Sequence, residues 1–369
     1  MRVAGIMSGT SLDGIDVAIV DISGNSVKTV GHAATPYTSA IRERILAVSN
    51  TECSTAQISR LNFTLGELYA KAVTETCSRC DIPLESIELI GSHGQTIFHK
   101  GQGETASTLQ IGESSVIAER LGIPVVSDFR TRDIAAGGHG APLVPLVDYM
   151  LFRSAAKSRA VLNIGGIANI TVLPRNAKPE NVVAFDTGPG NMVIDALAAL
   201  FTKGREHYDR DGRIAAESYL NRALLKKLLK DDYYSAPPPK TAGREQYGRE
   251  FIARLCATGL PIPDLIATAT VFTAVTIAMG IESFAPDAEE LIVSGGGVHN
   301  RQLMVQIEAF LPACRVTTSA EFSIDPDAKE AIAFAVLAHR TWRRQTGNLP
   351  SATGASHAVL LGKVTYGSK

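Results

Sequence analysis

Three glycine-rich turns constrain the fold of this chain more than any other feature of its sequence. They span residues 8–14 (SGTSLDG), 163–169 (NIGGIAN) and 294–300 (SGGGVHN), and each follows a short apolar run typical of a β-strand. Backbone amides in loops of small residues can approach phosphate oxygens closely. A single turn of this kind is readily explained by hairpin chemistry, but three of them predict an α/β protein that binds phosphate groups.

The usual phosphate-binding motifs are missing from the sequence. It contains no G-x-x-x-x-G-K-S/T segment, and no G-x-G-x-x-G follows a predicted strand, which disfavours P-loop NTPases and Rossmann dehydrogenases. The first turn instead offers amides and hydroxyls at Gly9, Thr10 and Ser11. Asp13 and Asp16 add hard oxygen donors of the kind that hold hydrated magnesium. We therefore expect phosphate and Mg²⁺ to share this turn.

The length of the chain favours two domains, because 369 residues exceed the size at which one hydrophobic core usually stops growing. A strand-rich opening with turns at glycine occurs twice, over residues 3–37 and 160–185, which suggests duplication of one β-meander-plus-helix unit. We place the first domain at residues 1–133, rejoined by residues 346–369, and the second domain at residues 134–345.

Apolar periodicity predicts the elements between these turns. Long helices are expected over residues 55–80, 214–230, 245–258, 263–284 and 326–346, and further strands over residues 89–92 and 290–294. The proline-rich segment 235–240 cannot continue a helix, because proline lacks the amide hydrogen and clashes with the preceding turn. It is either a rigid spacer between helices or, with the residues that follow it, one wall of a site.

Composition and charge exclude several classes of protein. The 36 basic and 37 acidic side chains are balanced and form no basic stripe, so a nucleic-acid partner is not expected. Five scattered cysteines, including Cys77 and Cys80 without a second pair, favour neither a disulfide framework nor a zinc site. The first residues show no export signal and the apolar runs fall short of a membrane span. We expect a cytoplasmic protein without a membrane partner.

One aspartate stands out as a candidate general base. Asp186 lies in the segment FDTGPGN, residues 185–191, at the end of an apolar strand and before a sharp turn into a helix. Phosphoryl transfer needs a group that orients or deprotonates the nucleophile. The alternative is that Asp186 only caps the turn by bonding backbone amides.

Taken together, these and further segments resemble the signature series of the anhydro-N-acetylmuramic acid kinase family. The matching segments are MSGTSLDG (7–14), GSHGQT (91–96), DFR (128–130), DIAAGG (133–138), GAPLVP (140–145), NIGG (163–166), DTGPGN (186–191), PPPK (237–240) with GRE (243–245), SGGG (294–297) and KEA (329–331). The resemblance covers nearly the whole chain and is highly specific in combination. One departure is His139, where the family pattern has glutamine.

The resemblance implies a two-domain actin-like (ribonuclease H-like) α/β sugar kinase fold with an ATP cleft between the domains. It implies a kinase that opens the 1,6-anhydro bridge of its sugar with water and phosphorylates the released O6. The products are N-acetylmuramic acid 6-phosphate and ADP. The cofactors implied are ATP and Mg²⁺, the partner is a small anhydro amino sugar, and a homodimer is plausible.

The resemblance also assigns roles to individual residues. Asp186 is the catalytic base, and Asp13 holds the metal. Arg130 binds the lactyl carboxylate of the sugar, with His93 and Glu330 as further partners. The ATP-binding residues implied are Gly9, Thr10, Ser11, Leu12, Asp13, Gly14, Ile15, Asp16, Asn163, Gly165, Gly166, Gly295, Gly296, Gly297 and Asn300.

Alternatives remain open at this stage. Arg130 could instead pair with Asp128 or Asp133, His93 could be a turn or core histidine, and Glu330 could simply favour a helix dipole. The substrate could be another anhydrosugar such as levoglucosan. An actin-like ATPase that is not a kinase is the alternative from a different class.

Overall fold

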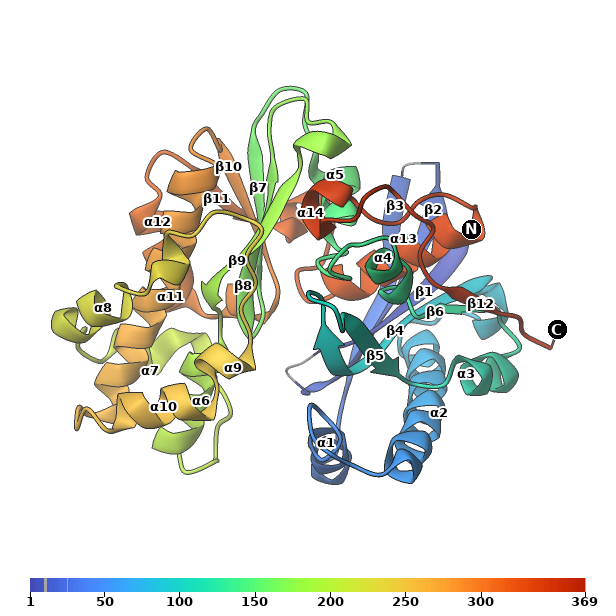
Figure 1. Cartoon of the computed structure of the whole chain (residues 1–369), viewed down its shortest axis with the longest axis horizontal. Helices are drawn as coiled ribbons and strands as arrows, with labels where there is room; N and C mark the ends of the chain where they lie inside the picture. The colour runs from blue at the N-terminus through green and yellow to red at the C-terminus, as the bar shows by residue number, and fades with distance from the viewer. Residues whose placement is uncertain (10–11, 25, 369) are drawn as a thin grey trace. The chain divides into compact units, whose positions relative to one another are not determined.

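The computed structural model describes residues 1–9, 12–24 and 26–368. The chain packs as two compact units (Figure 1). The first unit contains Met1–Leu151 and Ser323–Lys369, and the second contains Phe152–Phe322. Two of the residues predicted to bind ATP, Thr10 and Ser11, lie outside the described residues.

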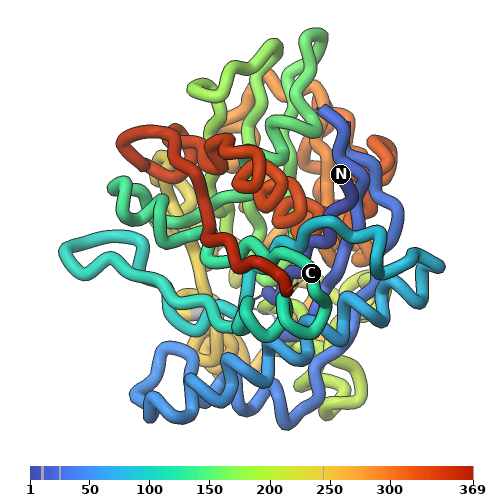
Figure 2. The backbone as a smooth tube through the Cα atoms, turned by 90° about the vertical axis from the view of Figure 1, so that its right-hand side faces the viewer, coloured from blue at the N-terminus to red at the C-terminus, as the bar shows by residue number. Residues whose placement is uncertain are grey.

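The first unit is built on one mixed sheet. Its strands are β1 (Arg2–Ser8), β2 (Gly14–Ser23), β3 (Ser26–Pro36), β4 (Leu89–Lys100), β5 (Ser107–Ile111), β6 (Val125–Ser127) and β12 (Lys363–Thr365), in the order β12-β6-β4-β1-β2-β3 with β5 beside β4. Strands β1, β2 and β3 form an antiparallel meander, while β4 is parallel to both β1 and β6. The C-terminal segment completes this sheet, because β12 pairs with β6 and Thr365 bonds Ser114 (Figure 2).

Helices of the first unit cover this sheet. They are α1 (Ser39–Leu46), α2 (Thr55–Arg79), α3 (Ser114–Leu121), α4 (Thr131–Ala135), α5 (Pro145–Phe152), α13 (Lys329–Trp342) and α14 (Pro350–Thr353). Helix α2 begins at a capping box in which Ser54 and Gln57 bond each other's backbone amides. Its buried face, which includes Leu61, Leu65 and Tyr69, packs into the main apolar cluster of this unit.

Helix α13 lies unusually close to the sheet, along β1 and β4 (Figure 1). Two glycines allow this approach: a Cβ atom at Gly5 would lie 1.9 Å from the carbonyl oxygen of Ala331, and one at Gly91 would lie 2.2 Å from that of Phe334. The helix is nearly all buried, and an ion pair between Lys329 and Asp148 (2.9 Å) fixes its first turn to α5.

We expect Gly5→Ala to destabilise the protein by about 3 kcal/mol or more, because the added methyl would displace the α13 backbone. Urea unfolding measures the loss. Gly24→Ala is the control: its Cβ would meet nothing within 4 Å, so only the left-handed backbone at this position costs energy, about 1–2 kcal/mol. Equal losses in the two variants would contradict the packing argument.

The second unit contains a five-stranded sheet. Its strands are β7 (Arg159–Ile164), β8 (Ile167–Leu173), β9 (Val183–Pro189), β10 (Glu290–Ser294) and β11 (Arg315–Thr318), in the order β11-β10-β7-β8-β9. Its helices are α6 (Met192–Phe201), α7 (Arg213–Ala216), α8 (Arg222–Leu228), α9 (Arg244–Tyr247), α10 (Arg249–Cys256), α11 (Ile262–Phe284) and α12 (Arg301–Phe310). The expectation that every apolar run falls short of a membrane span is wrong for helix α11, which is long and apolar enough to cross a membrane; however, 83% of its apolar window is buried in the protein, as in a core helix.

The two sheets share one topology. In each, the first three strands form an antiparallel meander and the next two strands continue from the first strand in parallel: β3-β2-β1-β4-β6 in one unit and β9-β8-β7-β10-β11 in the other. The repeated opening seen in the sequence is therefore a repeat of topology. The expected fold class, an α/β fold of ribonuclease H-like domains, is confirmed.

The edges of the units differ from the expected domain boundaries at 133/134 and 345/346. Residues 134–151 and 323–345 pack with the first unit, since α13 rests on β1 and β4 and its Lys329 pairs with Asp148. Sequence periodicity had assigned both stretches to the second domain because it does not show which sheet a helix covers.

Several predicted elements are also corrected. The helix expected over 214–230 is two short helices, because Asn221 caps a new one by accepting from the amide of Leu224. The helix expected over 245–258 is interrupted at Gly248. Strand β4 continues to Lys100 instead of ending at residue 92, and strands β11 and β12 were not predicted.

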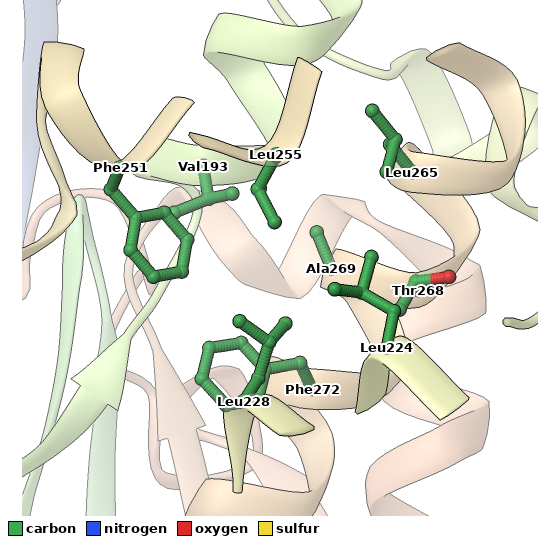
Figure 3. A pocket seen from close by; sticks show the side chains of 9 residues that line it. All are labelled: Val193, Leu224, Leu228, Phe251, Leu255, Leu265, Thr268, Ala269 and Phe272. Carbon is green, nitrogen blue, oxygen red and sulfur yellow. The ribbon is translucent and has the colours of Figure 1, made fainter. Parts of the chain in front are cut away.

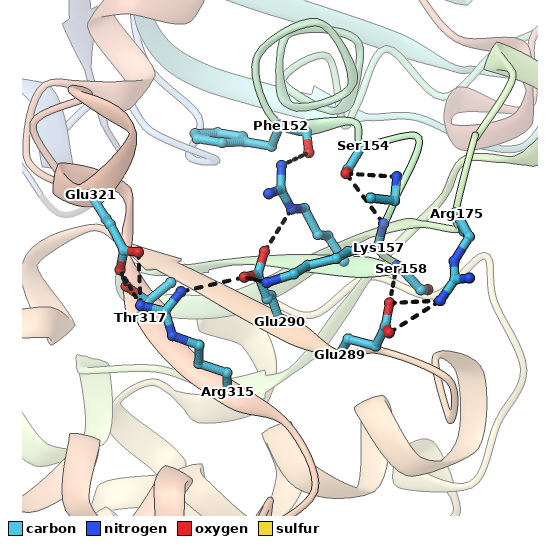
Figure 4. Close-up of polar contacts among 12 residues, drawn as sticks. Phe152, Ser154, Lys157, Ser158, Arg175, Glu289, Glu290, Arg315, Thr317 and Glu321 are labelled. Atoms are coloured by element: carbon cyan, nitrogen blue, oxygen red, sulfur yellow. Dashed lines mark hydrogen bonds and ion pairs between the residues drawn. The ribbon is translucent and has the colours of Figure 1, made fainter.

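A buried charge cluster ties β7, β10 and β11 together at the start of these strands (Figure 4). The Glu290 side chain is 3% exposed and pairs with Lys157, with Arg159 (2.9 Å) and with Arg315 (3.3 Å). Burial alone would raise the pKa of this carboxyl, but the hydrogen bonds from Lys157 and Arg159 lower it below its usual value.

The apolar core between α6, α8, α10 and α11 contains a small gap (Figure 3). Its lining is apolar except for Thr268, whose hydroxyl bonds the carbonyl of Asp264. With no charged group among its lining residues, the gap is an imperfection of packing and offers nothing to a polar ligand.

Candidate active site

A buried network of polar side chains holds the first glycine-rich turn, residues 8–14, in place. Ser8, the last residue of β1, donates to Gln95 Oε1 (2.6 Å) and bonds the Tyr37 hydroxyl (2.7 Å). Gln95 Nε2 donates in turn to the carbonyl of Gly9 (3.3 Å). The Arg42 side chain donates to the carbonyl of Leu12 (2.7 Å). The start and end of the turn are therefore fixed by side chains of other elements.

The predicted residues of this turn divide into two kinds. Leu12 and Ile15 are buried in the apolar core, so only their backbone is available to a ligand. Leu12 also has a positive φ of 61°, which is uncommon for a residue with a branched side chain. Asp13 is exposed, and one of its carboxylate oxygens accepts from the amide of Gly14 (3.1 Å). Asp16 is half-buried on β2.

Three carboxyl groups share one electrostatic environment in the first unit. Burial raises the pKa of Glu330, which lies in the first turn of α13, and the nearby carboxylates of Asp16 and Asp13 raise it further. Lys329 and Arg130 act in the opposite direction. The structure therefore brings Glu330 together with the turn that the sequence had assigned to phosphate and metal.

This arrangement fits a magnesium–nucleotide complex better than a resident metal ion. Among the described residues, no group of three His, Cys, Asp or Glu side chains is placed to hold a metal by itself. Mg²⁺ in phosphoryl-transfer sites typically uses one or two carboxylates and keeps waters and substrate phosphates as its other ligands. Asp13 and Asp16 match that requirement in number and chemistry.

Arg130 and His93 form a pair that the sequence did not predict. His93 is buried, and its Nε2 accepts from Nε (3.1 Å) and Nη2 (2.9 Å) of Arg130. Burial and the Arg130 charge hold the pKa of His93 well below its usual value, so the imidazole is neutral. Arg130 Nη1 donates to the carbonyl of Gly140 (2.8 Å).

The alternative partners of Arg130 are engaged elsewhere. Asp128 pairs with Lys363 (2.5 Å). Asp133 is fully buried and accepts from Asn348 and Thr353 (both 2.7 Å) and from the amide of Gly140 (2.8 Å). Burial lowers the pKa of Arg130 to about 10, with Glu330 and Asp133 opposing the shift, so its guanidinium remains charged at neutral pH.

The glycine turn of the second unit is braced by the segment that follows Asp186. The amides of Gly190 and Met192 donate to the carbonyl of Gly166 (2.9 and 3.2 Å), and that of Asn191 donates to the carbonyl of Gly165 (2.8 Å). A Cβ atom at Gly165 would meet nothing closer than 3.7 Å. The backbone here is held firmly but open on one side, as a phosphate cradle requires.

The late glycine segment lies directly beside this turn. Gly295 has a φ of 83°, and a Cβ at this position would lie 2.7 Å from the carbonyl oxygen of Ile164. Gly297 packs on the Ile164 side chain, whereas Gly296 is exposed. The side chain of Asn300 accepts from the amide of Leu303 (3.0 Å) and so caps α12. The structure therefore brings all the second-unit residues predicted to bind ATP into one place.

Asp186 lies on the same face of the five-stranded sheet as Asn163. Cross-strand pairing aligns Ser294 with Asn163, Asn163 with Asn169, and Asn169 with Asp186. Directly paired residues point to the same face, and neighbouring strands lie about 4.8 Å apart, so Asp186 is about 10 Å from Asn163. Asn169 was not singled out from the sequence, although its alignment with Asn163 and Asp186 places it between the glycine turn and the candidate base.

The environment of Asp186 suits a general base. Burial raises the pKa of its carboxyl to about 7, and the negative charge of Glu245 adds to this shift, while a hydrogen bond from the amide of Ala242 to Oδ2 (2.8 Å) opposes it. A base works best when its pKa lies near the working pH. A carboxylate that only capped a turn would be expected to have a lowered pKa.

A family model described as anhydro-N-acetylmuramic acid kinase matches residues 1–367. The chain belongs to this family. A relative of that name from Caldanaerobacter subterraneus subsp. tengcongensis is 43% identical over 381 residues, covering 98% of this chain and 96% of the relative. Another from Bacillus cereus strain G9842 is 42% identical over 382 residues, covering 99% of each chain.

Solved structures show a weaker likeness. The activator of 2-hydroxyisocaproyl-CoA dehydratase from Clostridium difficile superimposes with a TM-score of 0.46 at 11% identity, covering 92% of this chain and 94% of that one. The fold assignment therefore rests on the strand order of the two sheets. Membership of the family makes the protein a kinase, that is, a phosphotransferase with an alcohol group as acceptor.

Proposed function

We propose that the protein uses ATP and Mg²⁺ to open the 1,6-anhydro bridge of anhydro-N-acetylmuramic acid and to phosphorylate O6 of the same sugar. The products are N-acetylmuramic acid 6-phosphate and ADP, and the reaction belongs to cytoplasmic recycling of the cell wall. The observation that carries this proposal is Asp186, whose carboxyl has a pKa of about 7 on the same sheet face as a glycine turn.

In the proposed reaction the Asp186 carboxylate removes a proton from water while the water oxygen bonds to C1 of the sugar. The C1–O6 bond breaks, and its electron pair leaves on O6. The resulting oxyanion attacks the γ-phosphorus of ATP and ADP departs. Opening the bridge thus generates a stronger nucleophile than a sugar hydroxyl.

Each unit contributes separate groups to this reaction. In the second unit, Gly165 and Gly166 present backbone to the phosphates, and the segment Gly295 to Gly297 faces the adenosine. In the first unit, Asp13 and Asp16 would hold Mg²⁺, which when bound neutralises charge on the phosphates. We propose in addition that the protein is a homodimer, which light scattering would test.

Arg130 is proposed to bind the lactyl carboxylate of the sugar, since its planar guanidinium can hold a carboxylate through two hydrogen bonds. His93 fixes the guanidinium by accepting from two of its nitrogens, so we assign it a positioning role. Glu330, with its raised pKa, can exchange hydrogen bonds with a hydroxyl or amide of the sugar.

We expect Arg130→Gln to raise KM for the sugar about 100-fold, because truncating one partner of a desolvated charge pair costs about 2–5 kcal/mol. KM for ATP should stay unchanged. Initial-rate kinetics with each substrate varied in turn measures both values. Arg132→Gln, on the exposed side of α4, is the matched control. A similar rise in both KM values would argue against a role confined to the sugar.

The test of the proposed reaction is ADP release with ATP, magnesium and three sugars in parallel: anhydro-N-acetylmuramic acid, levoglucosan and N-acetylmuramic acid. We expect turnover of the first only, with a product heavier by one water and one phosphoryl group. Levoglucosan lacks the lactyl carboxylate that Arg130 would bind, so preference for it would overturn the assignment of substrate. Turnover of N-acetylmuramic acid alone would overturn the hydrolytic step.

A further inference from the structure

The base Asp186 is covered by one loop of the second unit, the segment from Tyr233 to Ala242. The Tyr233 hydroxyl donates to the carbonyl oxygen of Asp186 (2.7 Å), and the Asp186 amide donates to the carbonyl of Lys240 (3.1 Å). The amide of Ala242 donates to the carboxylate itself (2.8 Å). The backbone and the side chain of Asp186 are therefore both in contact with this loop.

Lys240 is placed to hold the loop in this position. Its ammonium donates to the carbonyls of Tyr233 (3.0 Å) and Tyr234 (3.2 Å), which closes the loop on itself. The same ammonium lies 5.0 Å from the ring centre of Tyr233, 5.5 Å from that of Phe284 and 5.7 Å from that of Phe185. Cation–π contacts with rings of α11 and β9 thus attach the loop to the core of the unit.

These contacts distinguish Lys240 from a lysine that binds phosphate. Two carbonyl oxygens accept hydrogen bonds from its nitrogen, and three aromatic rings lie around it. Its positive charge is therefore stabilised by groups of the protein itself. Burial also lowers the pKa of this amine. By contrast, Lys226 on α8 is exposed.

We infer that Lys240 is a positioning residue for the reaction, because its ammonium clamps the loop of residues 233–242 over the general base Asp186. This inference rests on the proposed function. With the clamp in place, the loop withdraws water from the carboxyl and aligns the Ala242 amide with Oδ2. Without it, the loop can open and water can reach the carboxylate.

The consequence is a change in how strongly Asp186 holds its proton. Burial is the main cause of its raised pKa, so hydration of the carboxylate should lower that pKa towards the ordinary value of about 4. The other titratable groups that face Asp186 are Glu245, Tyr233 and Tyr247. Of these, Glu245 is exposed and raises the pKa, while the two tyrosines stay neutral in the working pH range.

The test compares the pH dependence of kcat/KM for the sugar in wild-type protein and in Lys240→Met. We expect the acid limb to move down by about one pH unit or more. We expect kcat on the plateau to fall about tenfold or more, since a weaker and less well aligned base transfers the proton more slowly. KM for ATP should not change. Lys240→Arg keeps the charge and the ring contacts and should lie between the two.

Controls separate positioning from a general loss of structure. A merely structural defect would scale the rate at every pH and leave the acid limb where it is. Lys226→Met removes an exposed lysine of the same unit and should behave as wild type. If Lys240→Met does not fold, Tyr233→Phe replaces it, because it removes only the hydroxyl that fastens the same loop to Asp186.

The outcomes are distinct. An acid limb that stays near pH 7 in both Lys240→Met and Tyr233→Phe overturns the inference about Lys240 and leaves Asp186 as the base. Full activity in Asp186→Asn overturns the proposed function itself. A lowered acid limb with unchanged KM for ATP supports the clamp.

Discussion

Replacing Asp186 by asparagine is expected to lower kcat by about 10³-fold, because the amide cannot accept the proton that water must lose as it attacks C1. Nucleotide binding should persist, since the second-unit glycine turn that we propose to face ATP is braced through backbone contacts and not through the Asp186 carboxylate. Steady-state kinetics at saturating substrate measures kcat, and titration with a fluorescent ATP analogue measures nucleotide binding.

Asp287→Asn is the matched control for this substitution, because it makes the same chemical change at an exposed position of the second unit. It should leave kcat unaltered. A loss of ATP binding in Asp186→Asn that equals its loss of turnover would indicate a structural role for the aspartate, as in a turn cap.

The proposed role of Asp186 also predicts the pH dependence of the wild-type enzyme. Asp186 must be ionised to act as a base, and burial raises its pKa to about 7. The rate should therefore fall tenfold per pH unit below about pH 7 and level off above it. Because the pKa of Asp186 is higher in the folded protein than the unfolded value of about 4, its contribution to stability is greatest below about pH 4 and is lost as the pH rises from about 4 to about 7. Function and stability thus have opposite requirements at this residue.

Replacing Glu290 by glutamine is expected to lower the free energy of unfolding by about 2–4 kcal/mol. The substitution leaves Lys157, Arg159 and Arg315 without the buried carboxylate that they share. Removing one partner of a fully buried pair costs about 3–5 kcal/mol, and the figure is smaller here because Lys157 and Arg315 can be hydrated in part. Urea unfolding of the two proteins measures the difference.

The sign of the pH effect provides a second check. The pKa of Glu290 is lowered in the folded protein, so its contribution is complete above the unfolded value of about 4.3 and is lost as the pH falls further. The stability difference between wild type and Glu290→Gln should therefore shrink in acid. Glu308→Gln, at an exposed site on α12, should change stability little at any pH. A pH-independent difference would point to lost packing instead of lost charge pairing.

Local patterns in the sequence were sufficient to locate the strands and the turns of the candidate site. Apolar runs followed by glycine identified β1, β7 and β10, and the ends of these strands carry the predicted phosphate-binding residues. The repeat of the strand-rich opening also indicated the common topology. These signals are local, since a turn needs small residues wherever the backbone bends sharply.

What sequence reasoning missed depends on contacts between distant segments. Helix α13 was assigned to the second domain but packs with the first unit. Only the space left by Gly5 and Gly91 shows which sheet it covers. His93 pairs with Arg130, which lies 37 positions further along the chain, and Lys240 contacts Asp186 from 54 positions away. Periodicity of the sequence gives no signal for contacts between segments so far apart. Asn169 could have been found by counting positions forward across the turn from its partner Asn163 on β7.

The division of the chain between the two units has a consequence during protein synthesis. The second unit is one uninterrupted stretch, residues 152–322, so it can fold as soon as that stretch leaves the ribosome. The first unit cannot, because α13, which covers β1 and β4, and β12, which pairs with β6, are translated only after the whole of the second unit. An apolar face of its early strands therefore stays uncovered while roughly two hundred further residues are added, and transiently uncovered apolar surface of this kind is prone to aggregate.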